Sequence, residues 1–170
     1  MKGFSRGHSS MLTDEQFTLY AKQYIDTIFR VAFSYLKCHA DADDISQNVF
    51  IKLYRAGKNF ENDSHVKHWL IRVTINECKK ALISPWRRTE PIEDYANTLS
   101  FTSQEQNELF DKVMDLPKKY RVAVFLHYYE DYSTDEISQL LSIPKATVRT
   151  HLKRGREQLK NILKEVNIYV

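Results

Sequence analysis

Apolar residues recur three and four positions apart along most of this 170-residue chain, a spacing that places side chains on one face of an α-helix. In the N-terminal half, this spacing predicts one helix after Thr13, a second capped by Asp41, and a third that ends before Pro85. Three helices of this length can share one core. The pattern therefore predicts a first helical domain at residues 13–88, preceded by a disordered segment at residues 1–12.

The pattern changes after this predicted domain. Residues 89–103 are acidic and lack sustained helical spacing, which predicts a linker. Helical spacing returns from Ser103 and continues on both sides of a break at Leu116–Pro117, which predicts a second domain at residues 104–170. Alternation typical of strands is scarce. The expected fold class is all-α, with a three-helix bundle and a second small helical domain joined by the acidic linker.

The second predicted domain contains a pattern typical of a helix-turn-helix. Ser133 and Glu136 predict a capping box at the start of one short helix, and Pro144 suits the first position of the next helix. Gly155 costs about 1 kcal/mol inside a helix relative to alanine, which weakens the prediction that the second helix continues past its first three turns. The cations of that helix are Lys145, Arg149, Lys153, Arg154, Arg156, Lys160 and Lys164. Such a helix has the charge to enter a DNA major groove, and a solvated basic surface is the plain alternative.

The chain lacks the sequence motifs that are typical of several kinds of active site. There is no glycine-rich phosphate loop, no nucleophile motif and no pair of catalytic carboxylates, so we expect no catalytic residues and no cofactor. His65, His68 and Cys78 share helical spacing but lack a fourth ligand, so we expect no metal site. The isolated Cys38 and Cys78 are typical of free thiols in a reducing compartment. No apolar run is long enough to cross a bilayer, so we expect a cytoplasmic protein without direct membrane insertion.

Three blocks of the chain, in order, resemble a known family. Asp41–Arg55 (DADDISQNVFIKLYR) and His65–Leu82 (HVKHWLIRVTINECKKAL) resemble region 2 of the extracytoplasmic-function (ECF) class of bacterial RNA polymerase sigma factors. Leu116–Leu159, which includes the helix-turn-helix, resembles region 4 of the same class. The resemblance covers nearly all of residues 17–163. Ser142 stands where the turn usually has glycine, so we expect some backbone strain at this position.

The resemblance implies a sigma factor that binds core RNA polymerase and directs promoter-specific initiation of transcription. Region 4 is then expected to recognise the −35 duplex through Lys145, Ala146, Thr147, Arg149, Thr150, Lys153, Arg154 and Arg156. Region 2 is expected to bind the melted −10 element through Phe60, Asn62, Asp63, Ser64, His65, His68, Arg72, Asn76, Lys79 and Lys80. Docking on core polymerase is expected through Asp44, Gln47, Asn48, Phe50, Ile51 and Tyr54.

Residues within the region 4 set are expected to differ in role. Arg149 is the first candidate for a base contact and Lys145 the second, because early residues of a recognition helix reach base edges. For Lys153, Arg154 and Arg156 we expect contacts with phosphates only, which fix the register on the duplex.

The resemblance also implies the partners of the chain. These are promoter DNA, the clamp helices of the largest polymerase subunit, the β flap of the polymerase, and an anti-sigma factor that releases the protein in a bacterial stress response. A one-component helix-turn-helix regulator is the alternative. It would explain the second predicted domain but not the block Asp41–Leu82.

Overall fold

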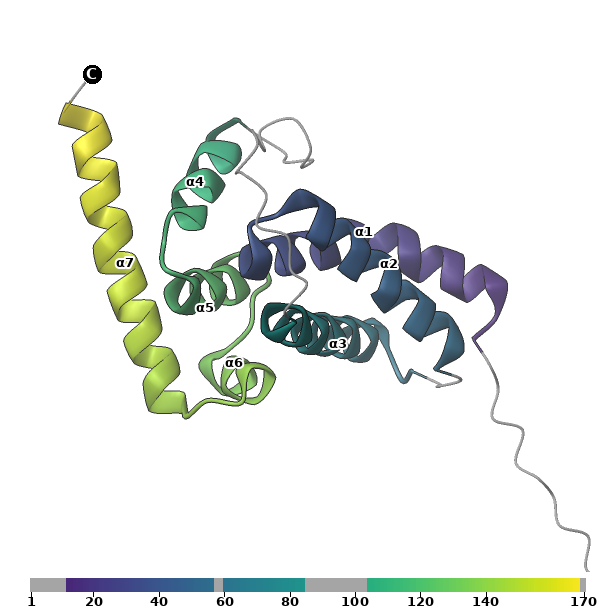
Figure 1. Cartoon of the computed structure of the whole chain (residues 1–170). Coiled ribbons are helices and arrows are strands. Elements are labelled where there is room, and N and C mark those ends of the chain that lie inside the picture. Colours follow the sequence, from purple (N-terminus) through teal and green to yellow (C-terminus); the bar gives the residue numbers. More distant parts are fainter. Residues whose placement is uncertain (1–11, 57–59, 85–103, 169–170) are drawn as a thin grey trace, which may run out of the picture.

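In the computed structural model, the described residues (12–56, 60–84 and 104–168) form seven α-helices and no strand (Figure 1). They are α1 (Asp14–Leu36), α2 (His39–Arg55), α3 (Asp63–Ile83), α4 (Gln104–Met114), α5 (Lys118–Tyr128), α6 (Thr134–Leu141) and α7 (Lys145–Ile168). The expected all-α fold class is confirmed. The expected linker, and all but the last residue of the expected disordered N-terminus, lie outside the described residues.

A capping side chain marks the start of α1 but not that of α2. The Thr13 hydroxyl accepts from the Gln16 amide (3.2 Å), and the Gln16 side-chain oxygen accepts from the Thr13 amide (3.1 Å), which completes a capping box at α1. The prediction that Asp41 caps the second helix is wrong. That helix, α2, begins earlier at His39, and Asp41 lies in its first turn, where the partial positive charge of a helix start favours an acid.

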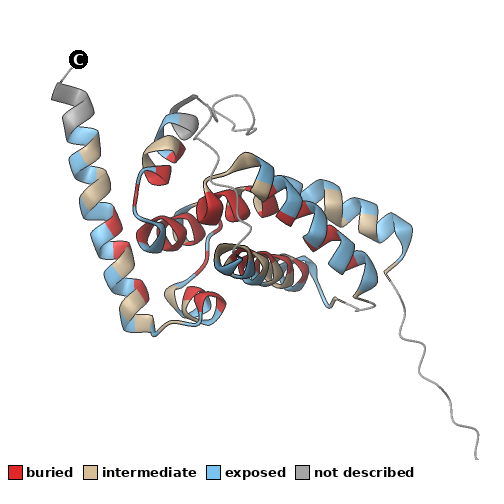
Figure 2. Cartoon of the chain, viewed as in Figure 1, coloured by how far each residue is buried: buried red, intermediate tan, exposed pale blue. Residues whose placement is uncertain are grey.

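Helices α1, α2 and α3 pack around a shared core, as their apolar stripes predicted. Ile28 of α1, Val49 of α2 and Leu70 of α3 are completely buried where these helices meet. Figure 2 shows the buried positions on the facing sides of the helices, with exposed positions on the outer sides. Burial of one apolar stripe from each helix is what stabilises the bundle.

A close approach of two helices organises the C-terminal half. Gly155 is buried against α5, and a Cβ atom at this position would stand only 2.6 Å from Cγ2 of Val124. Helix α7 runs through this glycine without a break. Gly155 is therefore a contact point between α5 and α7, and the expected weak point in the helix is not found.

The two halves of the chain bury surface against each other, a contact that helical spacing does not predict. Arg121 of α5 is only 5% exposed, and its Nε donates to the Ser34 carbonyl at the C-terminal end of α1, 2.5 Å away. Its Nη1 donates to the Leu116 carbonyl (2.9 Å). The rings of Phe33 and Phe110 stack across the same boundary, 6.4 Å apart between centroids. One contiguous core therefore runs through both halves (Figure 2).

Candidate nucleic-acid and polymerase interfaces

The helix-turn-helix forms as its capping signals predicted. The Ser133 hydroxyl accepts from the Glu136 amide (3.3 Å), and the Glu136 carboxylate accepts from the Ser133 amide (2.8 Å). Ser142 follows α6 in the left-handed region, with φ 56° and ψ 46°, the backbone conformation in which we expect a residue with a Cβ atom to be strained. Pro144, two residues later, directly precedes α7, which runs at an angle to α6 (Figure 1).

The first turns of α7 have one buried and one open face. Val148 and Leu152 are buried against the rest of the half, and they fix the rotation of the helix. The predicted −35 residues lie on the remaining faces, with Lys145 and Thr147 half-buried and the others exposed: Ala146, Arg149, Thr150, Lys153, Arg154 and Arg156.

The two candidates for a base contact have different surroundings. The ammonium group of Lys145 pairs with both carboxylate oxygens of Asp135 on α6, at 2.5 and 2.7 Å. This ion pair holds Lys145 against α6. Arg149 is exposed and has no hydrogen-bond or ion-pair partner among the described residues. Its guanidinium fork is thus available for a bidentate contact of the kind that recognises guanine.

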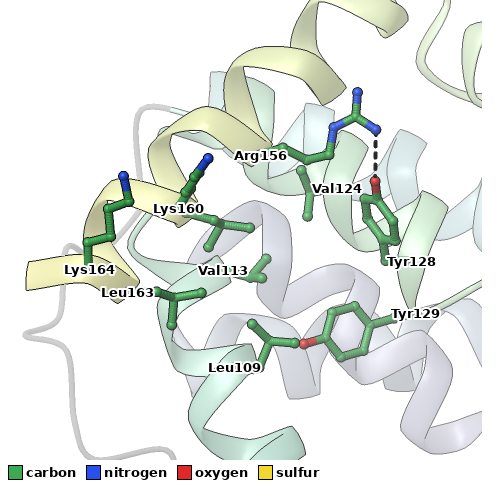
Figure 3. A pocket seen from close by; sticks show the side chains of 10 residues that line it. Leu109, Val113, Val124, Tyr128, Tyr129, Arg156, Lys160, Leu163 and Lys164 are labelled. Carbon is green, nitrogen blue, oxygen red and sulfur yellow. Dashed lines mark hydrogen bonds between the residues drawn. The ribbon is translucent and has the colours of Figure 1, made fainter. Parts of the chain in front are cut away.

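Arg156 does not belong with the open face of the first turns of α7. Its Nη1 donates to the Tyr128 hydroxyl (3.2 Å), and with Lys160 and Lys164 it forms one rim of an apolar groove of about 570 Å³ between α4, α5 and α7 (Figure 3). The walls of this groove include Leu109, Val113, Tyr129, Leu159 and Leu163. Helical spacing alone does not predict this groove, although the apolar Leu109 and Leu163 indicate an uncovered face on α4 and α7.

The predicted −10 surface follows the start of α3 and one side of that helix. Its exposed members are Asn62, Asp63, Ser64, His65, Arg72, Asn76 and Lys80. Phe60 is half-buried, because its ring packs edge-on against the rings of Tyr20, His65 and Trp69 at centroid distances of 6.3, 5.5 and 5.7 Å. Phe60 therefore anchors the loop before α3 and is not a free stacking platform.

Two members of this set have structural partners within the first half. The Asn62 side-chain oxygen accepts from the His65 amide (2.9 Å) and caps α3. The ammonium group of Lys80 pairs with Glu77 (2.9 Å), and the same carboxylate oxygen binds Lys52 of α2 (2.6 Å). Glu77 thus connects the predicted −10 surface to α2.

Two further members contact the C-terminal half. The ring of His68 lies 5.8 Å from that of Tyr132, and the ammonium group of Lys79 donates to the Leu141 carbonyl at the end of α6 (3.0 Å). Burial, and then the nearby cation of Arg72, lower the pKa of His68. In this arrangement some residues of the predicted −10 surface are therefore open to solvent, whereas others contact the C-terminal half.

The predicted polymerase-docking residues lie on the outer face of α2, with one correction. Asp44, Gln47, Asn48, Ile51 and Tyr54 are exposed. Ile51 and Tyr54 are 47% and 48% exposed, as expected of large apolar side chains on a docking surface. Phe50 is only 8% exposed, because it shares the buried face of α2 with Leu53, so it supports the surface from beneath.

Within the part of the chain that the structure describes, no cluster of three or more His, Cys, Asp or Glu side chains is placed to hold a metal ion. Among those same residues, no helix combines the length and apolar character needed to cross a membrane.

Comparison with known protein families assigns both halves of the chain. The family model for sigma-70 region 2 matches residues 20–88, and the model for sigma-70 region 4 matches residues 107–159. Together these matches cover every helix described above except the start of α1, the start of α4 and the end of α7.

Curated relatives match over most of their length. The ECF RNA polymerase sigma factor SigW of Bacillus subtilis is 29% identical over 161 residues, and the match covers 84% of this chain and 86% of SigW. The ECF RNA polymerase sigma-E factor of Escherichia coli K12 is 28% identical over 139 residues, and the match covers 71% of this chain and 73% of that protein.

Solved structures share the fold. The sigma factor RpoE of Bartonella quintana, in complex with the anti-sigma factor NepR, superposes with a TM-score of 0.64 at 20% identity, covering 88% of this chain and 98% of RpoE. CnrH, in complex with the cytosolic domain of CnrY, gives a TM-score of 0.63 at 18% identity, covering 92% of this chain and 93% of CnrH.

With both regions matched in order and relatives of similar length, the chain belongs to the ECF class of sigma-70 family RNA polymerase sigma factors. Members of this family are transcription initiation factors and not catalysts. They bind core RNA polymerase and promoter DNA, and they direct the polymerase to initiate at promoters.

Proposed function

We propose that three surfaces of this chain divide the work of promoter recognition. The first turns of α7 contact the −35 duplex, the open side of α3 binds the melted −10 strand, and the outer face of α2 docks on the clamp helices of core polymerase. The single observation that carries the proposal is the exposed Arg149, without a partner among the described residues, on a helix whose other side is locked into the core.

In the −35 contact, Arg149 recognises a base and its neighbours bind the backbone. A bidentate pair between arginine and guanine contributes about 1–3 kcal/mol of discrimination. Lys153 and Arg154 bind phosphates, and Ala146, Thr147 and Thr150 allow α7 to approach the groove closely. Lys145 contributes less to base recognition than the sequence suggests, because a base contact would break its ion pair with Asp135.

In the −10 contact, the open side of α3 holds the unpaired strand. Arg72 and Asn76 are exposed and lie four residues apart, so they share one side of the helix and can bind a phosphate and a base edge together. His68 and Lys79 contact the C-terminal half in this arrangement. Their binding to the strand therefore requires the two halves to separate when the protein joins the polymerase.

The domain boundaries and partners follow from the same division of labour. Residues 13–88 bind core polymerase and the −10 element. Residues 104–170 bind the −35 element and contact the β flap of the polymerase. Because the sigma factor RpoE was solved with the anti-sigma factor NepR bound, we include an anti-sigma factor among the partners of this chain. The place of action is the cytoplasm, where bacterial RNA polymerase works.

Binding of the assembled holoenzyme to a panel of −35 variants tests the proposal. Arg149→Ala should remove the preference at one base pair and leave the other positions unchanged. Lys153→Ala should instead weaken binding to every variant by a similar factor and reduce the salt dependence. A uniform loss with Arg149→Ala, with all base preferences retained, would contradict the assigned role.

A further inference from the structure

A small hollow lies between the start of α5 and the first three turns of α7, at the opposite end of α5 from the apolar groove. Its volume is about 230 Å³, and α5 contributes Lys119 and Tyr120 to its lining. The α7 side is formed by Ala146, Thr147, Thr150, His151 and Arg154. Four of these five α7 residues belong to the proposed −35 surface, so the hollow is continuous with it.

The lining carries positive charge and no carboxylate. The ammonium group of Lys119 stands 5.0 Å from the centroid of the Tyr120 ring. The Arg154 guanidinium lies 3.5 Å from the Tyr120 hydroxyl on the other helix. Tyr120 thus holds one cation from each helix near the same opening, an arrangement suited to an anion.

His151 adds a donor to this site. Its ring packs edge-on against Tyr120, 5.6 Å between centroids, and its Nδ1 atom is buried without a hydrogen-bond partner among the described residues. Nε2 is therefore the ring nitrogen left for a ligand. Burial, and then the cations of Lys119 and Arg154, lower the pKa of His151, so the neutral ring with its proton on Nε2 can donate to an anionic oxygen.

We propose that this hollow binds one phosphate of the promoter backbone beside the −35 element, with Lys119, His151 and Arg154 as its ligands. The inference rests on the proposed −35 function and adds Lys119 and His151 to it. A phosphodiester supplies the acceptor oxygens that these donors require, and a contact from the start of α5 fixes how far α7 turns into the groove. Free inorganic phosphate has the same chemistry and is the competing source of the ligand.

The test compares Lys119→Ala with a matched control, Lys118→Ala, in complete holoenzyme. Lys118 is the exposed neighbour of Lys119 and does not line the hollow. The −35 duplex is prepared as a series in which a single phosphate is replaced by a neutral methylphosphonate. We expect Lys119→Ala to weaken binding several-fold and to reduce the salt slope by about one ion. One methylphosphonate position should abolish the difference between the wild type and Lys119→Ala, while leaving any effect of Lys118→Ala intact.

Variants of His151 provide a second test of the phosphate site. His151→Gln retains a side-chain donor and should keep most of the coupling to that same phosphate, whereas His151→Leu should lose it. Equal effects of Lys119→Ala and Lys118→Ala, with no phosphate position coupled to Lys119, would overturn the inference. So would occupation of the hollow by inorganic phosphate alone, seen as a shift of the His151 ring signals that −35 DNA does not reproduce.

Different results would contradict the proposed −35 function and the proposed phosphate site. If Arg149→Ala leaves every base preference intact, the proposed −35 function itself fails. If Arg149→Ala alters one position but Lys119 shows no coupled phosphate, only the phosphate site fails.

Discussion

Lys79 on α3 donates from its ammonium group to the main-chain carbonyl of Leu141 at the end of α6, 3.0 Å away. A residue of the proposed −10 surface is thus bound to the helix-turn-helix that is proposed to contact the −35 element. The observed contact of Lys79 with Leu141 and its proposed contact with a DNA strand exclude each other. Binding of the −10 strand should therefore release α6 from α3.

Hydrogen–deuterium exchange measures this release. With core polymerase and a single-stranded −10 oligonucleotide that lacks −35 duplex, amides of α6 should exchange faster than in the free protein, while α3 should become more protected. Lys79→Ala should give faster exchange at α6 even without DNA. Unchanged protection of α6 with the strand bound would show that the halves stay together.

A second contact between the halves links Lys67 of α3 to the buried Glu130. The ammonium group lies 3.0 Å from the carboxylate and 3.2 Å from the Glu130 carbonyl. Lys67→Met should lower the free energy of unfolding by about 1–3 kcal/mol near neutral pH, because a buried charge loses its partner. Urea titration measures this loss, and Lys22→Met, at an exposed position on α1, is the control.

The pH dependence of this loss has a defined sign. Burial raises the pKa of Glu130 even with Lys67 beside it, and removal of Lys67 should raise it further. A carboxyl with a raised pKa in the folded state costs stability when it is charged, and this cost disappears as the pH falls. The difference between Lys67→Met and the wild type should therefore shrink on acidification. A difference that grows instead would contradict the buried position of Glu130.

His68 should make the contact between the halves sensitive to acid. Burial, and then Arg72, lower its pKa, whereas Glu136 from the other half acts in the opposite direction. A histidine with a lowered folded pKa contributes no penalty above its unfolded pKa of about 6.5 and destabilises the fold as the pH falls below it. Unfolding free energies of the wild type should thus decline more steeply below about pH 6.5 than those of His68→Gln. Parallel curves would rule out this contribution.

Gly155 should be intolerant of even one methyl group. Alanine favours helices, yet its Cβ would meet Val124 Cγ2 at 2.6 Å, so Gly155→Ala should cost about 1–3 kcal/mol through overpacking. Thermal unfolding measures the loss. The double variant Gly155→Ala with Val124→Ala should recover part of it, and purely additive losses would argue against a direct clash.

Replacement of Ser142 by glycine should raise the stability of the fold, in contrast to the substitution at Gly155. The backbone of Ser142 is left-handed, with φ 56°. This conformation is unfavourable for a residue with a Cβ atom, whereas glycine adopts it without strain. Ser142→Gly should therefore raise the free energy of unfolding by up to about 1 kcal/mol. The exposed Ser64 on α3 provides the control, since Ser64→Gly in a helix should lower it. A loss of stability in both variants would show that the turn is not strained.

Local signals in the sequence predicted the helices well and their contacts poorly. The capping boxes at Thr13 and Ser133 and the apolar stripes depend on neighbours within one or two turns, so they can be recognised in the chain itself. The contact of Arg121 with Ser34 joins residues far apart in sequence, and no periodicity indicates it. The prediction of a weak point at Gly155 is wrong for the same reason, because the missing side chain makes room for Val124 on another helix.

The candidate site shows the same division. The charge pattern of α7 predicted which of its sides is exposed. The ion pair of Lys145 with Asp135 could not be predicted in this way, because it depends on the angle between α6 and α7. Lys119 is not part of the predicted −35 set, because it precedes the helix-turn-helix in the sequence. Only the packing of α5 on α7 brings Lys119 beside His151.

Run-off transcription with core polymerase and a library of promoter fragments tests the central claim most directly. The account predicts that specific start sites appear only when this protein is added, and that Arg149→Ala shifts the preferred −35 sequence at one base pair. Transcripts that start at the same sites with and without the protein would contradict it.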